Sequence, residues 1–243
     1  MRGNMTALVA EGGESTRSED ATRRLRDMIL HGDFLVNDRL QEIQLSAVLG
    51  VSRTPIRTAL NTLHNEGLLD YTPKTGYRVR ALTLAEILQA YSVRSVLEGL
   101  ACRSVAQAGL EEKAVRKFER VLSQYEQIMR KNSHSEFDRM GIAELNQQFH
   151  TLILQQAGND MLSDFVQRAL NVPLTTLRVI PHSGLQQETA VESCRQSHVE
   201  HLKVFSAITA REPEAAEGAM RAHVERAARL VEIYYRDAHG ETR

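Results

Sequence analysis

A glycine, a serine and a proline within six residues separate two apolar helical patterns in the N-terminal third of the chain. Gly50 suits a helix end because glycine tolerates a left-handed backbone. Ser52 suits the start of the next helix, where its hydroxyl can accept a bond from a free amide. Pro55 then falls in the first turn, where its missing N–H costs little. The apolar residues that follow recur at helical spacing: Ile56, Leu60 and Leu63. This order predicts two helices joined by a tight turn.

Two arginines lie on the outward face of the second predicted helix. Arg53 and Arg57 are four residues apart, so their side chains share one face. One arginine can donate two bonds to O6 and N7 of a guanine, which is how a helix reads the major groove of DNA. A surface helix with two solvated arginines is the alternative interpretation, and it would suit an isolated Ser-Arg-Thr-Pro.

The residues around this segment favour the DNA-reading interpretation. An apolar helical pattern precedes Gly50, and Gly67 ends the second helix. The segment Thr72–Gly76 has turn chemistry, and Tyr77–Arg80 alternates like a return strand. Two helices followed by a hairpin make a winged helix. Lys74 at the hairpin tip would then reach a phosphate or the minor groove.

Residues 21–80 resemble the DNA-binding domain of the GntR family of bacterial transcription regulators. Val51–Leu60 matches the family's recognition helix, while Gly67–Leu69 and Gly76–Val79 match the helix end and the wing. The resemblance implies that a group of six residues serves DNA binding: Ser52 on a phosphate, Arg53, Thr54 and Arg57 on the operator, and Lys74 and Gly76 at the wing. Some members have a further DNA-contacting arginine where this chain has Ile43.

Composition favours a mainly helical protein and excludes a generic polyanion binder. The 243 residues are 42% hydrophobic and 5% aromatic, and the net charge is −1. Residues 21–80 hold nine Lys and Arg against six Asp and Glu, a net charge of +3, whereas residues 81–243 carry −2. This surplus is modest, so specific contacts and dimerisation would have to supply much of the affinity for DNA.

The chain has no apolar run of membrane-spanning length, so no membrane partner is expected. Residues 1–20 lack a signal-peptide core and are rich in Gly, Ser, Thr and acids, which predicts a mobile tail. Cys102 and Cys194 have no metal-ligand spacing and are expected to be reduced thiols. These features predict a cytoplasmic protein.

Residues 84–235 have helical apolar periodicity almost throughout. Gly, Pro and polar breaks divide this segment, which predicts an antiparallel bundle of six or seven helices. The whole chain is therefore expected to be mainly α, with a winged helix before the bundle. Expected helical patterns include Val115–Met129, Ile142–Gln156, Leu162–Arg178, Cys194–Thr209 and Glu214–Tyr235.

Three histidines lie on apolar helix faces in this second segment: His150, His201 and His223. Asn146 precedes His150 by one helical turn, so both side chains point the same way. Converging imidazoles could hold a divalent ion in a bundle core. Alternatively each histidine is isolated and hydrogen-bonded, which the residues alone favour. His198 is a local rival because it lies three residues before His201.

Residues 84–235 resemble the effector domain of the FadR-type subgroup of GntR regulators. The matching pieces include Arg94–Glu98, Asn146–His150, Glu200-His201 and Ala219–His223. The resemblance implies a divalent ion, zinc or nickel, held by Asn146, His150, His201 and His223, with no organic cofactor. Many members have an aspartate where this chain has Asn146, so the site has one negative charge fewer. It also implies that Arg94 and Asn146 bind a small carboxylate effector, although Arg94 could instead form an ion pair at the surface or between helices.

These features together predict a homodimeric transcription repressor. Its operator would be an inverted repeat in double-stranded DNA, since one winged helix reads too few base pairs. A small organic or sugar acid bound in the bundle would modulate operator binding. A metal-dependent hydrolase that uses the three histidines is the alternative, but no paired general base is apparent. A chromosome-architecture protein without an effector is a third hypothesis.

Overall fold

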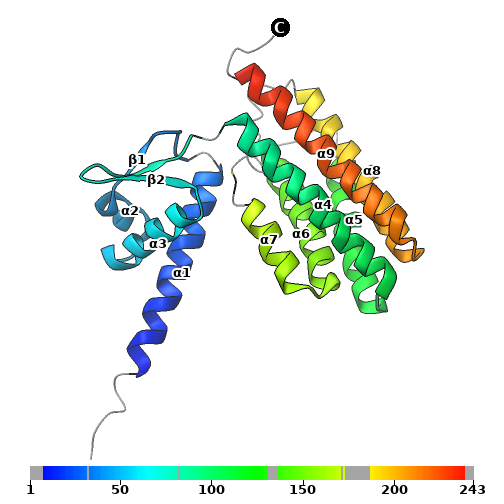
Figure 1. Cartoon of the computed structure of the whole chain (residues 1–243), viewed down its shortest axis with the longest axis horizontal. Helices are drawn as coiled ribbons and strands as arrows, with labels where there is room; N and C mark the ends of the chain where they lie inside the picture. Colours follow the sequence, from blue (N-terminus) through cyan, green and yellow to red (C-terminus); the bar gives the residue numbers. More distant parts are fainter. Residues whose placement is uncertain are drawn as a thin grey trace, which may run out of the picture. The chain divides into compact units, whose positions relative to one another are not determined.

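The computed structural model describes residues 8–31, 33–81, 83–130, 136–170, 172 and 187–238 (Figure 1). The chain divides into two compact units, Met1–Leu82 and Thr83–Arg243. The change from one to the other coincides with the step from hairpin pattern to continuous helical pattern in the sequence. Each unit has its own core and is described separately.

The N-terminal unit is a winged helix. Its elements are, in chain order, α1 (Leu8–His31), β1 (Arg39–Leu40), α2 (Glu42–Leu49), α3 (Arg53–Asn65), β2 (Leu69–Thr72) and β3 (Gly76–Val79). The antiparallel sheet has the order β1-β3-β2, with Leu40 opposite Tyr77 and Tyr77 opposite Tyr71. The predicted hairpin is therefore confirmed, whereas the two-residue strand β1 was not predicted.

Helix α1 packs against α3 and closes the core of this unit. Leu25 on α1 and Ile56, Leu60 and Leu63 on α3 are completely buried. The Arg26 guanidinium donates to both carboxylate oxygens of Glu66 at 2.7–3.0 Å, which joins α1 to the end of α3. Helix α3 is thus fixed on its inner face, and its outer face can present side chains.

The expected tail over residues 1–20 is wrong for residues 8–20, which form the first half of α1. Buried Ala21, Leu25 and Ile29 recur every four residues and anchor this helix in the core. The segment before them carries Gly12-Gly13 and several hydroxyl residues, which disfavour helix in isolation. Its helical structure therefore depends on the anchored continuation rather than on local composition. Residues 1–7 lie outside the described residues.

The turn between α2 and α3 follows the predicted backbone but not the predicted cap. Gly50 adopts φ +69 and ψ 26, and its N–H bonds to the Ser46 carbonyl at 3.0 Å. Ser52 has the extended backbone of an N-cap, yet its side chain makes no capping bond. A cap hydroxyl usually accepts from the second or third helical amide, and the third residue here is Pro55, which has no N–H. The expected hydroxyl bond was therefore wrong.

The C-terminal unit is a helical bundle, and the structure describes six helices in it. They are α4 (Leu84–Ala108), α5 (Glu112–Met129), α6 (Glu136–Ala157), α7 (Asp160–Leu170), α8 (Gln187–Thr209) and α9 (Pro213–Ala238). Helix α4 begins at a capping box in which the Thr83 hydroxyl accepts from the Glu86 amide. Helices α4 and α9 pack along each other, with α8 beside α9 (Figure 1).

The predicted helix Leu162–Arg178 is shorter in the structure, because α7 ends at Leu170. Of residues 171–178, only Val172 is described, as a bend, and residues 171 and 173–178 lie outside the described part. The other predicted helices are present with boundaries shifted by a few residues. No helix in the described ranges is long and apolar enough to cross a membrane.

Two glycines with room for a side chain allow the effect of backbone strain to be measured apart from the effect of packing. Neither Gly50 nor Gly218 has an atom within 4 Å of an added Cβ, but only Gly50 has a positive φ. We expect Gly50→Ala to lower the stability of the winged helix by about 1 kcal/mol or more. Gly218→Ala inside α9 should instead raise the stability of the bundle by roughly 0.5–1 kcal/mol. Denaturant unfolding monitored by circular dichroism measures both. Equal effects in both variants would contradict the assigned turn geometry.

Candidate DNA-reading face and histidine cluster

The first turn of α3 presents the predicted DNA-binding side chains to solvent. Ser52, Arg53, Thr54 and Arg57 are all exposed, and the side chains of the two arginines are 59% and 65% accessible. Pro55 and Ile56 between them are buried. This division follows from helical periodicity, because the inner face of α3 is apolar and its outer face is polar.

Both arginines are paired with one carboxylate from the preceding helix. Glu42, the first residue of α2, accepts bonds from Arg53 and from Arg57 at 2.9–3.3 Å. The hydrogen bond from Arg57 is the largest influence on the pKa of Glu42, and with Arg53 it holds that pKa below its usual value despite partial burial. Sequence reasoning missed Glu42. The only feature of the sequence that could have drawn attention to Glu42 is its position at the start of the helix before the turn.

The wing tip lies at the turn between β2 and β3, as the hairpin pattern predicted. Lys74 and Gly76 have φ values of +72 and +83, and Lys74 is exposed. Ile43, at the position where some family members have an arginine, is 68% exposed next to Glu42. The winged helix thus carries all six predicted DNA-binding residues on exposed or half-buried turns and helix ends.

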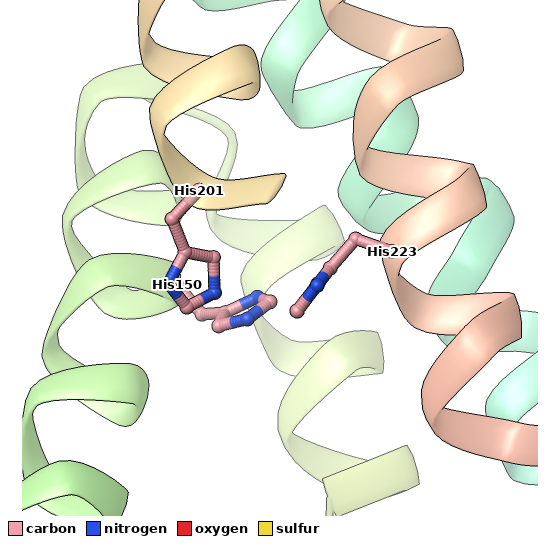
Figure 2. A group of neighbouring side chains, drawn as sticks. All are labelled: His150, His201 and His223. Atoms are coloured by element: carbon pink, nitrogen blue, oxygen red, sulfur yellow. The ribbon is translucent and has the colours of Figure 1, made fainter. Parts of the chain in front are cut away.

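The three histidines of the bundle meet in its interior (Figure 2). His150 comes from α6, His201 from α8 and His223 from α9, and their accessibilities are 6%, 0% and 4%. One ring nitrogen from each lies within 4.8 Å of the others. We call these three residues the histidine cluster. Their convergence from three helices is the arrangement that a bundle uses for metal sites.

Two carboxylates orient two of the three histidine rings through hydrogen bonds to Nδ1. Nδ1 of His150 donates to Glu98, and Nδ1 of His223 donates to Oε2 of Glu200 at 2.8 Å. Ionised carboxylates only accept, so each imidazole carries a proton on Nδ1, and in the neutral ring Nε2 is then the nitrogen with a free lone pair. Such carboxylate–histidine pairs are the usual support of metal-binding imidazoles. The carboxylates were missed in the sequence, although Glu200 directly precedes His201.

Arginines keep both supporting carboxylates ionised. Burial alone would raise the pKa of Glu98, but Arg94 and His150 hold it well below its usual value. Burial likewise opposes the ionisation of Glu200, and hydrogen bonds from His223 and Arg226 lower its pKa to about 2. The Arg226 Nε contacts Glu200 at 2.7 Å. Both carboxylates therefore remain negative at neutral pH.

Arg94, the predicted effector contact, is buried and paired in this structure. Its Nε donates to Oε1 of Glu98 at 2.7 Å, and its guanidinium lies 5.3 Å from the centre of the Tyr91 ring. The sequence alternative was an ion pair at the surface or between helices, whereas the observed pair is buried and lies within α4. Because Glu98 also accepts from His150, Arg94 is linked to the histidine cluster through one carboxylate.

Several buried polar atoms of the bundle have no hydrogen-bond partner among the described residues. They are Oδ1 of Asn146, Nε2 of His150, Nδ1 of His198 and both ring nitrogens of His201. Buried polar groups are normally paired, because an unpaired one costs free energy. Burial also lowers the pKa of His201 well below its usual value and brings that of His223 to about 4. Neutral imidazoles with unpaired nitrogens are the form that ligates a metal.

His198 is not a member of the group that meets within 4.8 Å. Its ring stacks on Tyr125 with centres 4.9 Å apart and an angle of 14°. Tyr125 in turn donates to the Cys194 carbonyl at 3.1 Å. The rival raised by the sequence therefore packs as an aromatic neighbour of the cluster. Cys194 is half-buried and Cys102 is buried, and both are free thiols.

Two family patterns match the chain, one in each unit. The FCD domain matches residues 89–226, and the pattern described as bacterial regulatory proteins, gntR family, matches residues 17–79. The first covers the bundle with all three histidines. The second covers the winged helix with both arginines.

Curated relatives and a solved structure agree with this division. The chain is 28% identical to an uncharacterized HTH-type transcriptional regulator, YdhC, from Bacillus subtilis, over 82% of this chain and 84% of the relative. It is 30% identical to a probable D-xylose utilization operon transcriptional repressor from Paenarthrobacter nicotinovorans, over 86% and 87%. The fold is similar to that of Escherichia coli McbR/YncC, with a TM-score of 0.73 and 17% identity over 91% and 98% of the chains. The chain therefore belongs to the GntR family of bacterial transcription regulators, with an N-terminal DNA-binding domain and a C-terminal FCD domain.

Proposed function

We propose that this regulator is a homodimeric repressor whose operator binding is modulated by a small organic or sugar acid, bound in the FCD domain through a divalent metal ion. The observation that carries the proposal is the buried histidine cluster with unpaired ring nitrogens. Relatives support repression: one from Escherichia coli, 28% identical, is the HTH-type transcriptional repressor RspR. Membership of a regulator family replaces the hydrolase alternative.

The proposed metal ligands are Nε2 of His150, the imidazoles of His201 and His223, and Oδ1 of Asn146. Imidazole nitrogens suit zinc and nickel, and an amide oxygen adds a weak neutral ligand. A bound ion would give partners to three of the unpaired atoms, Oδ1 of Asn146, Nε2 of His150 and one ring nitrogen of His201, and would leave coordination positions for an effector. An acid is the favoured effector because four neutral ligands leave the charge of the ion uncompensated. Arg94 is proposed to add its positive charge to the effector contact, together with Asn146.

The proposed DNA contacts are the outer face of α3 and the wing. Arg53, Thr54 and Arg57 would enter the major groove, while Ser52 meets a phosphate. Lys74 and Gly76 would approach the backbone of the adjacent groove. Two copies related by a two-fold axis would read an inverted repeat, which extends the site and squares the discrimination of one domain.

An exposed apolar stripe on α4 supports dimerisation of the bundle. Val93, Val96 and Leu100 follow the helical spacing of three and four residues and remain about half exposed. Helix α7, which packs against α4, adds exposed Met161 and Phe165. Contiguous apolar surface of this kind marks an interface. A second copy is the proposed occupant because a palindromic operator requires a symmetric dimer.

Arg57→Ala should remove most sequence discrimination while the fold stays intact. The side chain is exposed, and one bidentate base contact contributes roughly 1–3 kcal/mol, which a dimer loses twice. The measurement is binding to a duplex that the wild-type chain selects from a random library, compared with a scrambled duplex. Arg23→Ala removes one exposed charge from α1 and serves as the control. An unchanged preference in Arg57→Ala would refute the recognition-helix assignment.

A fragment of residues 84–243 should form a folded helical dimer that does not bind DNA. It contains the second compact unit except for Thr83, the N-cap of α4. Circular dichroism measures its helicity, and light scattering measures its mass. Val96→Glu places a charge in the α4 stripe and should shift the fragment toward monomer without loss of helicity. A wild-type fragment that is monomeric or unfolded would contradict the proposed interface.

Asn146→Asp should raise metal affinity, by roughly tenfold or more, because a carboxylate adds a negative charge to three neutral imidazoles. The measurement is metal content after dialysis against a weak chelator. Gln147→Glu adds the same charge at an exposed position of α6 and should change nothing. His201→Ala in the Asn146→Asp background should abolish the gain.

Two results would overturn this metal assignment. If Asn146→Asp retains no more metal than wild type, Asn146 is not a ligand. If wild type and variant are both metal-free after exposure to zinc or nickel, the three histidines are structural residues of the core.

A further inference from the structure

The N-terminus of α2 places one carboxylate against both exposed arginines of α3. Oε2 of Glu42 accepts from Nε and Nη2 of Arg53 at 3.3 and 3.0 Å. Arg57 makes a two-pronged contact, with Nε 2.9 Å from Oε1 and Nη2 3.0 Å from Oε2. Glu42 is only 23% exposed, whereas its partners are 59% and 65% exposed. One partly buried carboxylate therefore holds two exposed arginine side chains.

The atoms used in these contacts decide what each arginine can still do. A guanidinium has five N–H groups in a rigid plane, two of them parallel along the side edge formed by Nε and Nη2. Glu42 contacts both arginines along this side edge. Nη1 of either arginine makes no hydrogen bond with the described residues, so the terminal edge, formed by Nη1 and the second N–H of Nη2, remains available. Two parallel donors on one edge match O6 and N7 of a guanine.

We propose that Glu42 is a positioning residue for DNA recognition, which holds Arg53 and Arg57 by their side edges and presents their terminal edges to guanine bases. This inference rests on the proposed role of these arginines in reading the operator. Glu42 would stay in contact during binding rather than leave. The ordering of two long side chains would then be complete before DNA arrives, which reduces the entropic cost of binding.

The same carboxylate also reduces attraction to DNA of any sequence. Two arginines and one glutamate carry a net charge of +1 where the arginines alone carry +2. Binding to phosphates depends on this charge, whereas bidentate base contacts depend on geometry. Glu42 would therefore favour the operator over other sequences in two ways, by fixing the geometry and by weakening the competing phosphate contacts.

The position of Glu42 suits a rigid support. It occupies the first turn of α2, where a carboxylate is favoured by the helix dipole. Leu45 and Leu49 of the same short helix are buried in the winged-helix core, so the helix itself is fixed. The carboxylate stays ionised because the hydrogen bond from Arg57, aided by Arg53, lowers its pKa. An exposed ion pair adds little stability, so its removal should leave the fold intact.

The test uses the full chain and two duplexes: the one that wild type selects from a random library, and a scrambled duplex of the same composition. Glu42→Gln keeps the shape of the side chain but loses its charge and one acceptor. It should weaken binding to the selected duplex and strengthen binding to the scrambled one. The ratio of the two affinities should fall on the order of tenfold, and the salt dependence of scrambled binding should steepen by about one unit of slope.

Three further variants separate positioning from charge. Asp33→Asn removes an exposed acid of the same unit that is not the ion-pair partner of Arg53 or Arg57, and it should change both affinities equally. Glu42→Asp keeps the charge and should give an intermediate ratio. In an Arg57→Ala background, Glu42→Gln should cost less discrimination than in wild type, because one of the two residues it positions is already absent.

Two results would overturn the role of Glu42. If Glu42→Gln tightens binding to both duplexes equally, as Asp33→Asn does, the carboxylate only masks charge. If Arg57→Ala loses discrimination while Glu42→Gln keeps it, the arginines read DNA without this support. An Arg57→Ala variant that keeps full discrimination is a different failure, since it refutes the proposed recognition helix itself.

Discussion

Three imidazoles buried together in a helical bundle need hydrogen-bond partners, and those partners need partners of their own. Their ring nitrogens lie away from water, and only two of them find carboxylates, Glu98 and Glu200. Glu98 is buried and Glu200 is partly buried, and they pair with Arg94 and Arg226. The resulting network ties four helices, α4, α6, α8 and α9, to one point. Packed apolar residues would often serve stability as well as buried charges do, so a network of this extent is best explained by binding.

The winged helix could be predicted from the sequence because its signals are local. Gly50 adopts the left-handed backbone expected at a helix end, and Gly76 does the same in the wing. Strand β1 left no such signal, since its two residues are a strand only through pairing with β3. The cap at Ser52 failed for a local reason that the sequence did contain: Pro55 removes one of the amides that the hydroxyl would have met.

The histidine cluster could be predicted only through family resemblance. Residues 150, 201 and 223 come from three helices, and nothing in their spacing states that these helices face one another. Taken alone, each was as consistent with a satisfied core histidine. The supporting carboxylates were harder still, because Glu98 contacts a histidine 52 residues away. The Arg94–Glu98 pair was also not predicted, although its spacing of four residues along a helix is a local signal that brings two side chains together.

The two sites share one physical device at different depths. In both sites, a carboxylate binds one side of a functional group and leaves the other side available to a ligand. In the bundle the available atom is Nε2 of His150, and on α3 it is the terminal edge of Arg53 and of Arg57. In the bundle, burial strengthens the hydrogen bond between carboxylate and imidazole, because no water is present to screen it. Exposure makes the device on α3 weak as a source of stability. Its effect must therefore be sought in how the arginines meet DNA, where the geometry of two donors decides which base is accepted.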